Sequence, residues 1–443
     1  MRFRTKRVQT HAVPLWLMCC AFAGPAWAEA PTRPTSVPIS AINAGDTAWM
    51  ITATVLVLLM TIPGLGLFYA GMVRKKNVLA TLAQSFAVCA LVSLLWMMAG
   101  YSLAFMPGTP WLGSLAGRGL DTVFFDKVAG RVSVHPLAPS VPEAVFVMFQ
   151  LSFAIITPAL IVGAFAERMR FSALLWFMGL WSLLVYAPVA HWVWASDGWL
   201  ATRGALDFAG GTVVHINAGA AGLVAAYWLG PRHGFGRVPL TPSNLGLTMA
   251  GAALLWVGWM GFNGGSAGAA DGRAGMALLA TQLGAAAGTL AWMVCEWLVR
   301  GTPTLLGLCS GAVAGLVAIT PASGFVGPLS AVIIGGVAGV GCCWGATGLK
   351  RLLGADDSLD VFGVHAVGGL IGALLTGVLA SVRIGGAEPS MVAQALASFS
   401  VLLYSGVVTA LILFVVQRVV GLRVATADEV EGLDLSQHGE RLE

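Results

Sequence analysis

Apolar positions in this 443-residue chain form long continuous runs, separated by short polar segments rich in Gly, Pro and charged residues. About 20 consecutive apolar residues are needed for a helix to cross the hydrocarbon core of a bilayer. We predict eleven such segments, near residues 47–73, 77–104, 142–166, 171–194, 208–229, 244–262, 274–299, 304–320, 326–349, 361–380 and 392–419. The pattern therefore predicts an all-α membrane protein with eleven transmembrane helices, although the Gly-rich stretch 304–349 can be divided in other ways.

The first 28 residues have the three parts of a secretory signal peptide. A basic start is followed by the apolar residues 12–23, which are too few to span a bilayer, and by a small-x-small site at residues 26–28. We interpret residues 1–28 as a signal peptide, 29–420 as the membrane domain and 421–443 as a polar tail. Cleavage would leave the mature N-terminus outside the cytoplasm; the alternative is an uncleaved N-terminus.

The basic residues of the short loops indicate the orientation of the chain. With the N-terminus outside, the inner loops contain Arg74, Lys75, Lys76, Arg168, Arg170, Arg232, Arg237, Arg300, Lys350, Arg351 and Arg423. The outer loops have only scattered basic residues, such as Arg203, Arg273 and Arg383. This asymmetry follows the positive-inside rule and places the tail in the cytoplasm.

Composition excludes several classes of protein. The chain is 57% hydrophobic and 10% charged, whereas soluble domains are about 25% charged. A net charge of +4 without a basic run that includes aromatic residues argues against nucleic acid as a partner. Five of the seven cysteines lie beyond the signal peptide, all in apolar segments and without metal-ligand spacing, so we predict neither a metal site nor disulfides.

Two histidines lie within predicted membrane segments, and an aspartate precedes each by eight residues. The pairs are Asp207 with His215 and Asp357 with His365. At a rise of ~1.5 Å per residue, each histidine is about 12 Å from the start of its segment. The two segments run in opposite directions, so both histidines approach the middle of the bilayer. This arrangement predicts an inverted repeat of five plus five helices, with one extra helix and a polar centre at the repeat interface.

Other interpretations of these residues stay open. A membrane histidine can simply hydrogen-bond a neighbouring helix, and two imidazoles without a carboxylate or thiolate make a poor metal site. An aspartate at the start of a helix is stabilised by the helix dipole. We therefore interpret Asp207 as a residue that fixes the pore entrance rather than as a proton carrier, and Glu296 as structural.

Aromatic residues cluster near the outer ends of three predicted helices. Phe149 and Phe153 share one helix face, Trp194 ends the fourth segment, and Trp259 and Phe262 end the sixth, shortly before Ser266. Aromatic faces attract cations. The alternative is an interfacial aromatic belt.

The segment of residues 207–232 resembles the signature of the ammonium transporter (Amt) family. Further similar motifs occur at residues 61–64, 163–168, 261–267, 360–365, 431–434 and 438–440. This resemblance covers nearly the whole mature chain. It implies a homotrimer in the bacterial cytoplasmic (inner) membrane, with one pore in each protomer and a tail that binds the nitrogen-signalling PII protein.

The resemblance also implies a role for each candidate residue. Trp194, Phe149 and Ser266 would form an outer ammonium site that Asp207 supports; Phe153 and Phe262 would form a gate; and His215, His365 and Trp259 would line the pore. Moving an intact cation through a dry pore is very costly, whereas neutralising an amine with a pKa near 10.4 at pH 7 costs about 4–5 kcal/mol. We therefore expect deprotonation, conduction of ammonia and separate transfer of the proton, without a cofactor.

Two other functions remain as alternatives. One is an ammonium sensor that signals through its cytoplasmic tail. The other is an intramembrane hydrolase, but no serine or cysteine lies in an activating motif, so we do not expect an enzyme.

Overall fold

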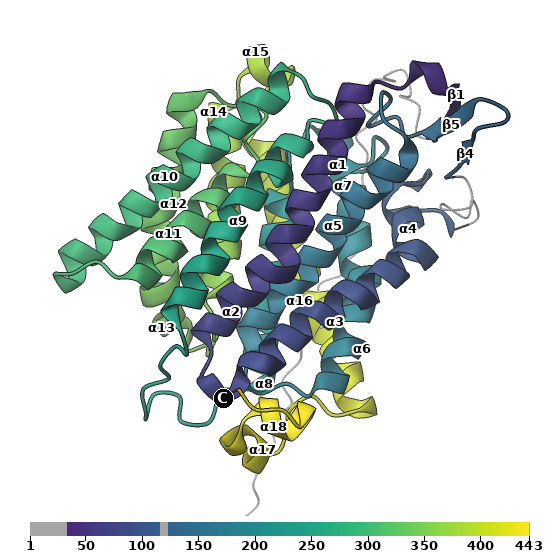
Figure 1. Ribbon diagram of the computed structural model, residues 1–443. Coiled ribbons are helices and arrows are strands. Elements are labelled where there is room, and N and C mark those ends of the chain that lie inside the picture. Colours follow the sequence, from purple (N-terminus) through teal and green to yellow (C-terminus); the bar gives the residue numbers. More distant parts are fainter. Residues whose placement is uncertain (1–32, 116–122, 443) are drawn as a thin grey trace, which may run out of the picture.

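The computed structural model describes residues 33–115 and 123–442, which form a bundle of long helices (Figure 1). The predicted signal peptide lies outside these residues. The α-helices are α1 Ala44–Leu59, α2 Gly66–Met72, α3 Val78–Leu95, α4 Tyr101–Phe105, α5 Glu143–Ile161, α6 Phe171–Trp181, α7 Ala187–Trp194, α8 Asn217–Leu229, α9 Leu245–Gly265, α10 Gly272–Arg300, α11 Leu305–Ile319, α12 Pro328–Trp344, α13 Lys350–Leu353, α14 Val367–Leu379, α15 Val382–Gly385, α16 Met391–Val419, α17 Thr426–Glu431 and α18 Leu433–His438.

Each predicted hydrophobic segment falls on a helical span. In the described part of the chain, ten helical spans are long and apolar enough to cross a membrane. The predicted segment 304–320 is the shorter apolar helix α11. Several spans consist of two α-helices that a π-helical turn joins. The π-helical turns that join two α-helices are Met60–Leu65, Trp96–Gly100, Ser182–Tyr186 and Gly345–Leu349, whereas Gly211–Ile216 and Phe362–Ala366 are π-helical turns that begin their spans.

Capping side chains explain where several spans begin. An Asn, Asp, Thr or Ser side chain accepts a hydrogen bond from a backbone N–H in the first turn and so satisfies a donor that the helix leaves free. These N-cap residues are Asn43, Asn244, Asp271, Thr304 and Ser390. Polar residues between apolar runs therefore mark the helix boundaries.

One end of the bundle carries a small antiparallel sheet, and we call this end the sheet side (Figure 1). The strands are β1 Thr35–Pro38, β2 Gly108–Thr109, β3 Leu112–Gly113, β4 Phe125–Asp126 and β5 Arg131–Val134. They form a three-stranded sheet in the order β1-β5-β4 and a separate β2-β3 ribbon. The sequence pattern predicts only helices and loops here, because strands of two to four residues are too short to show a period.

The opposite end carries α17 and α18, and we call it the tail side (Figure 1). These two helices pack against the start of α3. The Leu433 N–H donates to Asn77 Oδ1 at 2.9 Å, and the Ala80 N–H donates to Asp434 Oδ1 at 2.7 Å. Leu433 is buried in a small apolar cluster with Ala80 and Val424. The tail is thus a docked part of the fold.

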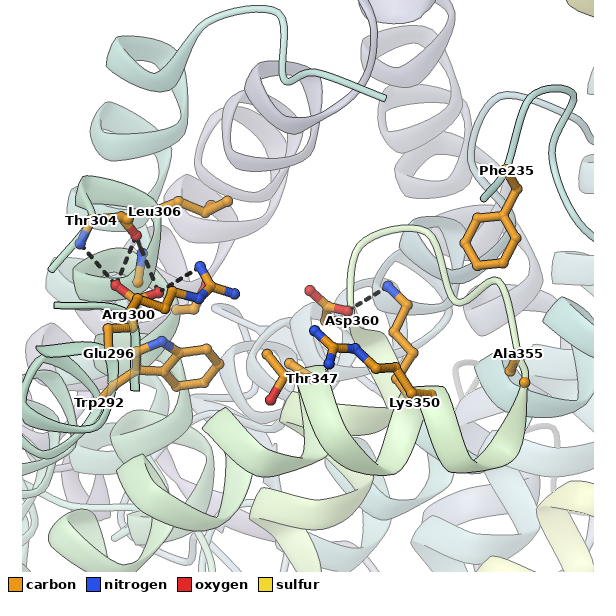
Figure 2. Close-up of a pocket in the computed structure, with 15 residues that line it drawn as sticks. Phe235, Trp292, Glu296, Arg300, Thr304, Leu306, Thr347, Lys350, Ala355 and Asp360 are labelled. Atoms are coloured by element: carbon orange, nitrogen blue, oxygen red, sulfur yellow. Dashed lines mark hydrogen bonds and ion pairs between the residues drawn. The ribbon is translucent and has the colours of Figure 1, made fainter. Parts of the chain in front are cut away.

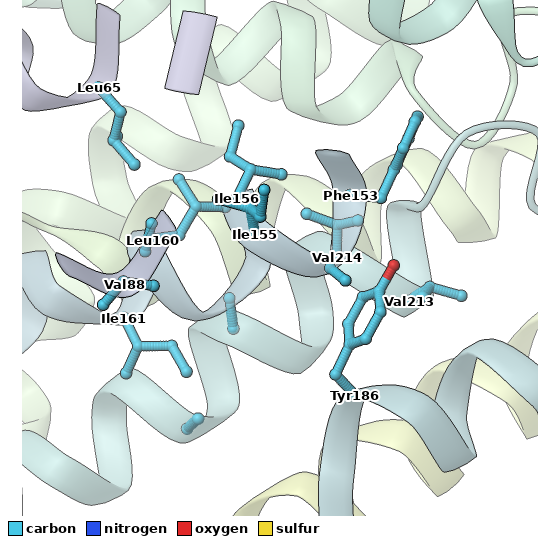
Figure 3. Close-up of a cluster of buried hydrophobic side chains, with 14 of the residues drawn as sticks. Leu65, Val88, Phe153, Ile155, Ile156, Leu160, Ile161, Tyr186, Val213 and Val214 are labelled. Atoms are coloured by element: carbon cyan, nitrogen blue, oxygen red, sulfur yellow. The ribbon is translucent and has the colours of Figure 1, made fainter. Parts of the chain in front are cut away.

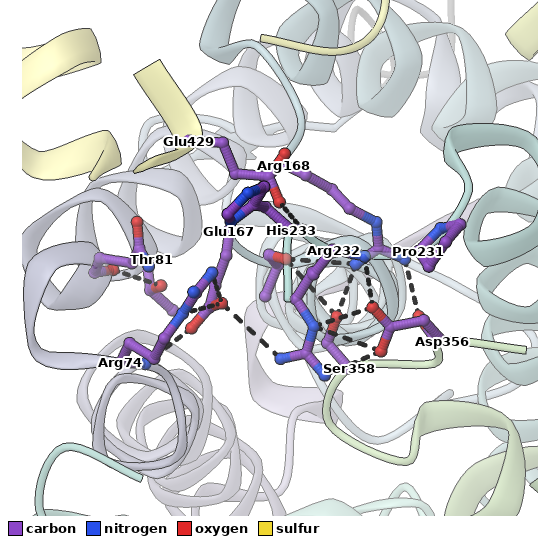
Figure 4. A network of polar contacts seen from close by, with 12 residues as sticks. Arg74, Thr81, Glu167, Arg168, Pro231, Arg232, His233, Asp356, Ser358 and Glu429 are labelled. Carbon is purple, nitrogen blue, oxygen red and sulfur yellow. Dashed lines mark hydrogen bonds and ion pairs between the residues drawn. The ribbon is translucent and has the colours of Figure 1, made fainter. Parts of the chain in front are cut away.

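A network of buried charges joins the tail-side segments to one another (Figure 4). Arg232 Nη2 lies 2.8 Å from Asp356 Oδ1, and Arg74 Nη2 lies 2.6 Å from Glu167 Oε2. Arg168 donates to Ser358 Oγ at 2.6 Å. Burial raises the pKa of Asp356, but the bonds and the charge of Arg232 outweigh it and hold the pKa below its usual value. Because each buried charge has partners, the network closes this end of the bundle without an isolated charge.

The hydrophobic core surrounds α5 and the span Gly211–Leu229, which are the most deeply buried spans. Figure 3 shows Ile155 and Ile156 of α5 near Val213, Val214 and Tyr186. All five side chains are buried. Residues on these two spans are therefore held rigidly in the middle of the molecule.

Candidate functional site

His215 and His365 meet at the centre of the bundle, each on a π-helical turn. His215 belongs to Gly211–Ile216 and His365 to Phe362–Ala366. Their Nδ1 atoms are 3.3 Å apart, and the two ring planes differ by 15°. A hydrogen bond between two Nδ1 atoms requires that one nitrogen carries the proton and that the other accepts it. π-Helical turns are often found at functional sites, but these two have no recognisable sequence signal.

Two glycines allow the histidine-bearing helices to cross in backbone contact. A Cβ added to Gly219 would lie 2.4 Å from the backbone nitrogen of Ala366, and one added to Gly369 would lie 2.8 Å from the Gly211 carbonyl oxygen. Each glycine follows its histidine by four residues, about one helical turn. The four-residue spacing from each histidine to its glycine thus places the glycine where the two helices touch.

Asp207 caps the turn that carries His215. Its carboxylate accepts hydrogen bonds from the backbone N–H groups of Gly210, Gly211, Thr212 and Val213 and from the Thr212 hydroxyl. All of its acceptor capacity goes to the start of this helix. Asp207 therefore fixes the start of the span that carries His215. Asp357 has a similar place, because its Oδ2 accepts from the Phe362 N–H at 2.7 Å.

Aromatic rings lead from His215 towards the sheet side. The Trp259 ring lies 5.4 Å from the His215 ring at an interplanar angle of 19°. The Phe262 ring follows at 5.3 Å from Trp259 and 4.3 Å from the Phe153 ring. Trp259 Nε1 donates to Thr320 Oγ1 at 2.8 Å, which fixes this indole. The rings of Phe153 and Phe262 pack directly against each other.

A cavity of about 230 Å³ lies beyond Phe153 on the sheet side. Four of the candidate residues line it, namely Phe149, Phe153, Trp194 and Ser266. The Trp194 ring stands at 89° to that of Phe153, at 5.7 Å. Asp207 and Trp259 are not among the lining residues. The structure thus brings the outer candidates together and places Asp207 behind them.

Other residues that line this cavity were not selected as candidates from the sequence, among them Gln150, Phe208 and Arg273. Gln150 Oε1 is buried and has no hydrogen-bond partner among the described residues. Gln150 could have been selected from the sequence because it follows Phe149, and adjacent residues of a helix can both border one cavity. Phe208 and Arg273 are far apart in the sequence, so only the fold brings them to the same wall.

A second cavity, of about 550 Å³, lies on the tail side (Figure 2). Glu296 at its border accepts hydrogen bonds from the Thr304 N–H and hydroxyl, at 2.8 and 2.9 Å. Lys350 Nζ and Asp360 Oδ1 pair at 2.7 Å. None of the candidate pore residues lines this cavity. The described residues also contain no group of three or more His, Cys, Asp or Glu side chains arranged to hold a metal.

Comparisons with known proteins show the family to which the chain belongs. Residues 48–442 match the sequence profile of the Ammonium Transporter Family. The chain is 47% identical over 406 residues to an ammonium transporter of Bacillus subtilis, covering 90% of this chain and 98% of that one. It is 46% identical over 408 residues to one of Aquifex aeolicus, covering 90% and 93%.

Solved structures show the same architecture. The crystal structure of Candida albicans Mep2 matches with a TM-score of 0.80 at 37% identity, covering 88% of each chain. A solved sensor Amt protein also matches with a TM-score of 0.80, at 28% identity and covering 89% of this chain and 98% of that one. On this evidence the chain is a member of the ammonium transporter family, a family of membrane transporters and not of enzymes.

Proposed function

We propose that this protein conducts ammonium across the membrane by binding the cation on the sheet side, removing a proton and passing ammonia along the two histidines. The observation that supports this most strongly is the buried His215–His365 pair, in which the His215 ring stacks on Trp259 and Phe262. An apolar path with paired imidazoles suits a small neutral molecule that both donates and accepts hydrogen bonds.

The first step is recruitment in the cavity that Phe149, Trp194 and Ser266 line. The Ser266 hydroxyl donates its hydrogen to the Phe262 carbonyl oxygen at 2.9 Å. The lone pairs of the hydroxyl oxygen therefore remain free to accept a hydrogen bond from ammonium. Ammonium has four N–H donors, whereas potassium has none, and a hydroxyl acceptor therefore favours ammonium. Trp194 Nε1 donates to the Asp207 carbonyl oxygen at 2.9 Å, which holds the indole as a wall of the site. Its aromatic face adds a cation–π attraction.

The second step is transfer of a proton from ammonium to water in the outer cavity, before the substrate passes Phe153 and Phe262 as ammonia. An intact cation between these rings would have neither water nor a hydrogen-bond acceptor, and burial of an unpaired charge is very costly. Ammonia does not carry this cost. The gate therefore passes ammonia only when the rings separate.

The third step is transfer along the histidine pair. Because the two Nδ1 atoms share one hydrogen, one imidazole has a free Nε2 acceptor and the other has an Nε2–H donor. The His215 Nε2 has no partner among the described residues. When the free Nε2 takes up a proton, the shared proton shifts to the other ring, and that ring releases its own Nε2 proton. The two rings then exchange roles and one proton has been relayed, which provides a route for the proton separate from that of ammonia.

We propose the following architecture for the working transporter. The eleven helices comprise the ten long spans and α11, arranged as an inverted five-plus-five repeat with α16 added. The protomers form a homotrimer in the bacterial inner membrane, with the sheet side outside and the tail in the cytoplasm. Basic residues concentrated on the tail side support this orientation.

We also propose a PII protein as a partner on the tail side. α17 and α18 lie beside the loop at Lys76, whose Nζ bonds the Glu429 carbonyl oxygen at 3.1 Å. A protein that binds the tail would therefore meet this loop as well. Co-elution of this trimer with a purified PII protein tests the proposal, and its failure with and without nucleotides would reject it.

Ammonium sensing is the second candidate function, because a sensor Amt protein has the same fold. The lower identity to that protein, 28% against 47% for a transporter, favours transport. Methylammonium uptake by proteoliposomes, with and without a membrane potential, separates the two functions. Saturable uptake that ammonium inhibits supports transport, whereas binding without uptake supports sensing.

A further inference from the structure

A fixed cation borders the outer cavity. Arg273, the second residue of α10, lines the same space as Ser266 and Trp194. A guanidinium remains charged at every physiological pH. It therefore raises the electrostatic potential in a cavity that would collect another cation.

The guanidinium is held between two aromatic rings. Its Cζ lies 4.8 Å from the ring centroid of Phe208 and 5.0 Å from that of Phe325. Its Nε donates to the Gly324 carbonyl oxygen at 3.3 Å. A Cβ on Gly324 would lie only 2.1 Å from the Phe208 ring, so this arrangement requires glycine there. The charge is thus fixed in place and cannot swing freely into bulk water.

Among the residues that the structure describes, no carboxylate forms a direct ion pair with this guanidinium, and only Asp271 attracts it from a longer distance. Across the described residues, no Asp or Glu oxygen lies within 4.0 Å of the Arg273 guanidinium. The nearby Asp271 side chain instead accepts from the N–H groups of Arg273 and Ala274, both at 2.9 Å, as the N-cap of α10. The start of a helix is also an unfavourable place for a cation, because the helix dipole is positive there. The position therefore carries an electrostatic cost that packing alone does not explain.

The ring that holds Arg273 is joined directly to the wall of the recruitment site. Phe208 follows Asp207, whose carbonyl oxygen accepts the Trp194 indole hydrogen bond. The Phe208 N–H in turn donates to the Pro321 carbonyl oxygen at 3.1 Å. The cation–π clamp and the aromatic wall are thus parts of one rigid unit.

We propose that Arg273 is a specificity-determining residue that weakens binding of the intact cation in the outer cavity and favours its deprotonation. The guanidinium repels ammonium and potassium but has little effect on neutral ammonia, so it favours loss of the proton beside Phe153. This inference depends on the proposed recruitment role of the cavity. The same charge limits how long a cation that cannot deprotonate occupies the site.

The test compares three variants in proteoliposomes. Arg273→Gln removes the charge and keeps a polar side chain, whereas Arg273→Lys keeps the charge. Arg203→Gln is the matched control, because Arg203 also stacks on a ring, at 5.2 Å from that of Trp199, and also bonds a backbone carbonyl, but does not line the cavity. For each variant, KM and maximal rate for methylammonium and inhibition by potassium are measured.

For Arg273→Gln we expect a KM lower by roughly three- to thirtyfold, as for a unit charge removed from a partly hydrated site. The maximal rate should fall, and potassium should inhibit more strongly. Arg273→Lys and Arg203→Gln should stay near wild type in KM. The difference between wild type and Arg273→Gln should shrink at high ionic strength, because salt screens the charge. An unchanged or higher KM in Arg273→Gln would overturn the inference.

Equilibrium binding separates this inference from the proposed transport. Ammonium titrations of the detergent-solubilised protein, followed by the fluorescence of its tryptophans, do not require transport. Tighter ammonium binding by Arg273→Gln than by the wild type supports the role of Arg273, whether or not the wild type shows uptake. Absence of uptake by the wild type would reject the proposed transport but not the role of Arg273. Equal binding by the two proteins would reject the role of Arg273 while leaving transport intact.

Discussion

Gly219 lies directly against the backbone of Ala366, the residue after His365, and this contact sets the distance between the two histidine-bearing helices. A methyl group on Gly219 would lie 2.4 Å from the Ala366 nitrogen and 2.6 Å from its Cβ. Neither neighbour is the flexible end of a side chain, so the helices themselves must separate. The histidine pair therefore depends on a residue that does not touch the substrate path.

Gly219→Ala should lower both stability and transport. Overpacking of this kind costs about 1–3 kcal/mol, and the separated helices would break the bond between the Nδ1 atoms of His215 and His365. The matched control is Gly406→Ala in α16, where the new methyl group would meet only Val224 Cγ2 at 3.8 Å. That variant should be neutral or slightly more stable, because alanine favours a helix by roughly 0.5–1 kcal/mol over glycine. Equal melting temperatures for the two variants would contradict the close approach.

His215→Ala and His365→Ala should each reduce selective ammonium transport while leaving the oligomer folded. Loss of a hydrogen-bonding partner in a dehydrated path costs about 1–3 kcal/mol, which corresponds to roughly a five- to 150-fold loss of uptake. Methylammonium uptake with competing potassium measures both rate and selectivity. His191→Gln is a control at another buried histidine, which bonds the Ala104 and Thr109 carbonyl oxygens. It should affect stability only, and unchanged uptake and selectivity in both pore variants would remove the histidines from the mechanism.

Ser266→Ala should mainly weaken apparent affinity. A hydrogen bond to a charged group contributes about 1.5–3 kcal/mol, so KM should rise by roughly ten- to hundredfold. Trp194→Leu should act in the same direction through the lost aromatic face. Ser182→Ala is the matched control, because the Ser182 hydroxyl also donates to a backbone carbonyl, that of Gly179, but does not line the cavity. A loss of maximal rate with intact KM in Ser266→Ala would argue against recruitment.

The membrane spans could be predicted from the sequence because length and hydrophobicity alone decide whether a segment can cross a bilayer. The meeting of His215 and His365 could also be predicted from the sequence. Each histidine lies eight residues after an aspartate, on segments that enter the membrane from opposite sides, so both reach the same depth. The π-helical turns that carry them were not, because an extra residue in a helical turn leaves no periodic pattern.

In the outer cavity, too, some residues could be assigned from the sequence and others could not. Phe149 and Phe153 could be assigned to one wall because helical spacing places both on one face. Arg273 and Phe208 could not, because their contact depends on how a loop and the start of α10 pack together. The β1-β5 pairing between Thr35–Pro38 and Arg131–Val134 escaped prediction for a similar reason, as its partners are distant in sequence.

The pH dependence of stability should include a contribution from His135, which follows β5 on the sheet side. Its ring stacks on Phe146 at 4.3 Å, its Nδ1 accepts from the Leu137 N–H at 3.2 Å, and burial lowers its pKa to about 4. The unfolded chain has an ordinary histidine pKa near 6.5, so between pH 6.5 and 4 the unfolded state binds more protons than the folded state. Stability should therefore fall as the pH falls through this window, by up to about 3 kcal/mol, and this contribution should level off below pH 4.

His135→Phe isolates this contribution, because it keeps an aromatic ring beside Phe146 but cannot take up a proton. Other groups titrate in both proteins alike, so the difference between the two melting temperatures reports on His135. Between pH 7.5 and 4.5, the wild type should lose more stability than the variant. If the two proteins lost stability in parallel across this range, His135 would not be the buried neutral group that its contacts require, since a charged imidazole could not accept the Leu137 hydrogen bond.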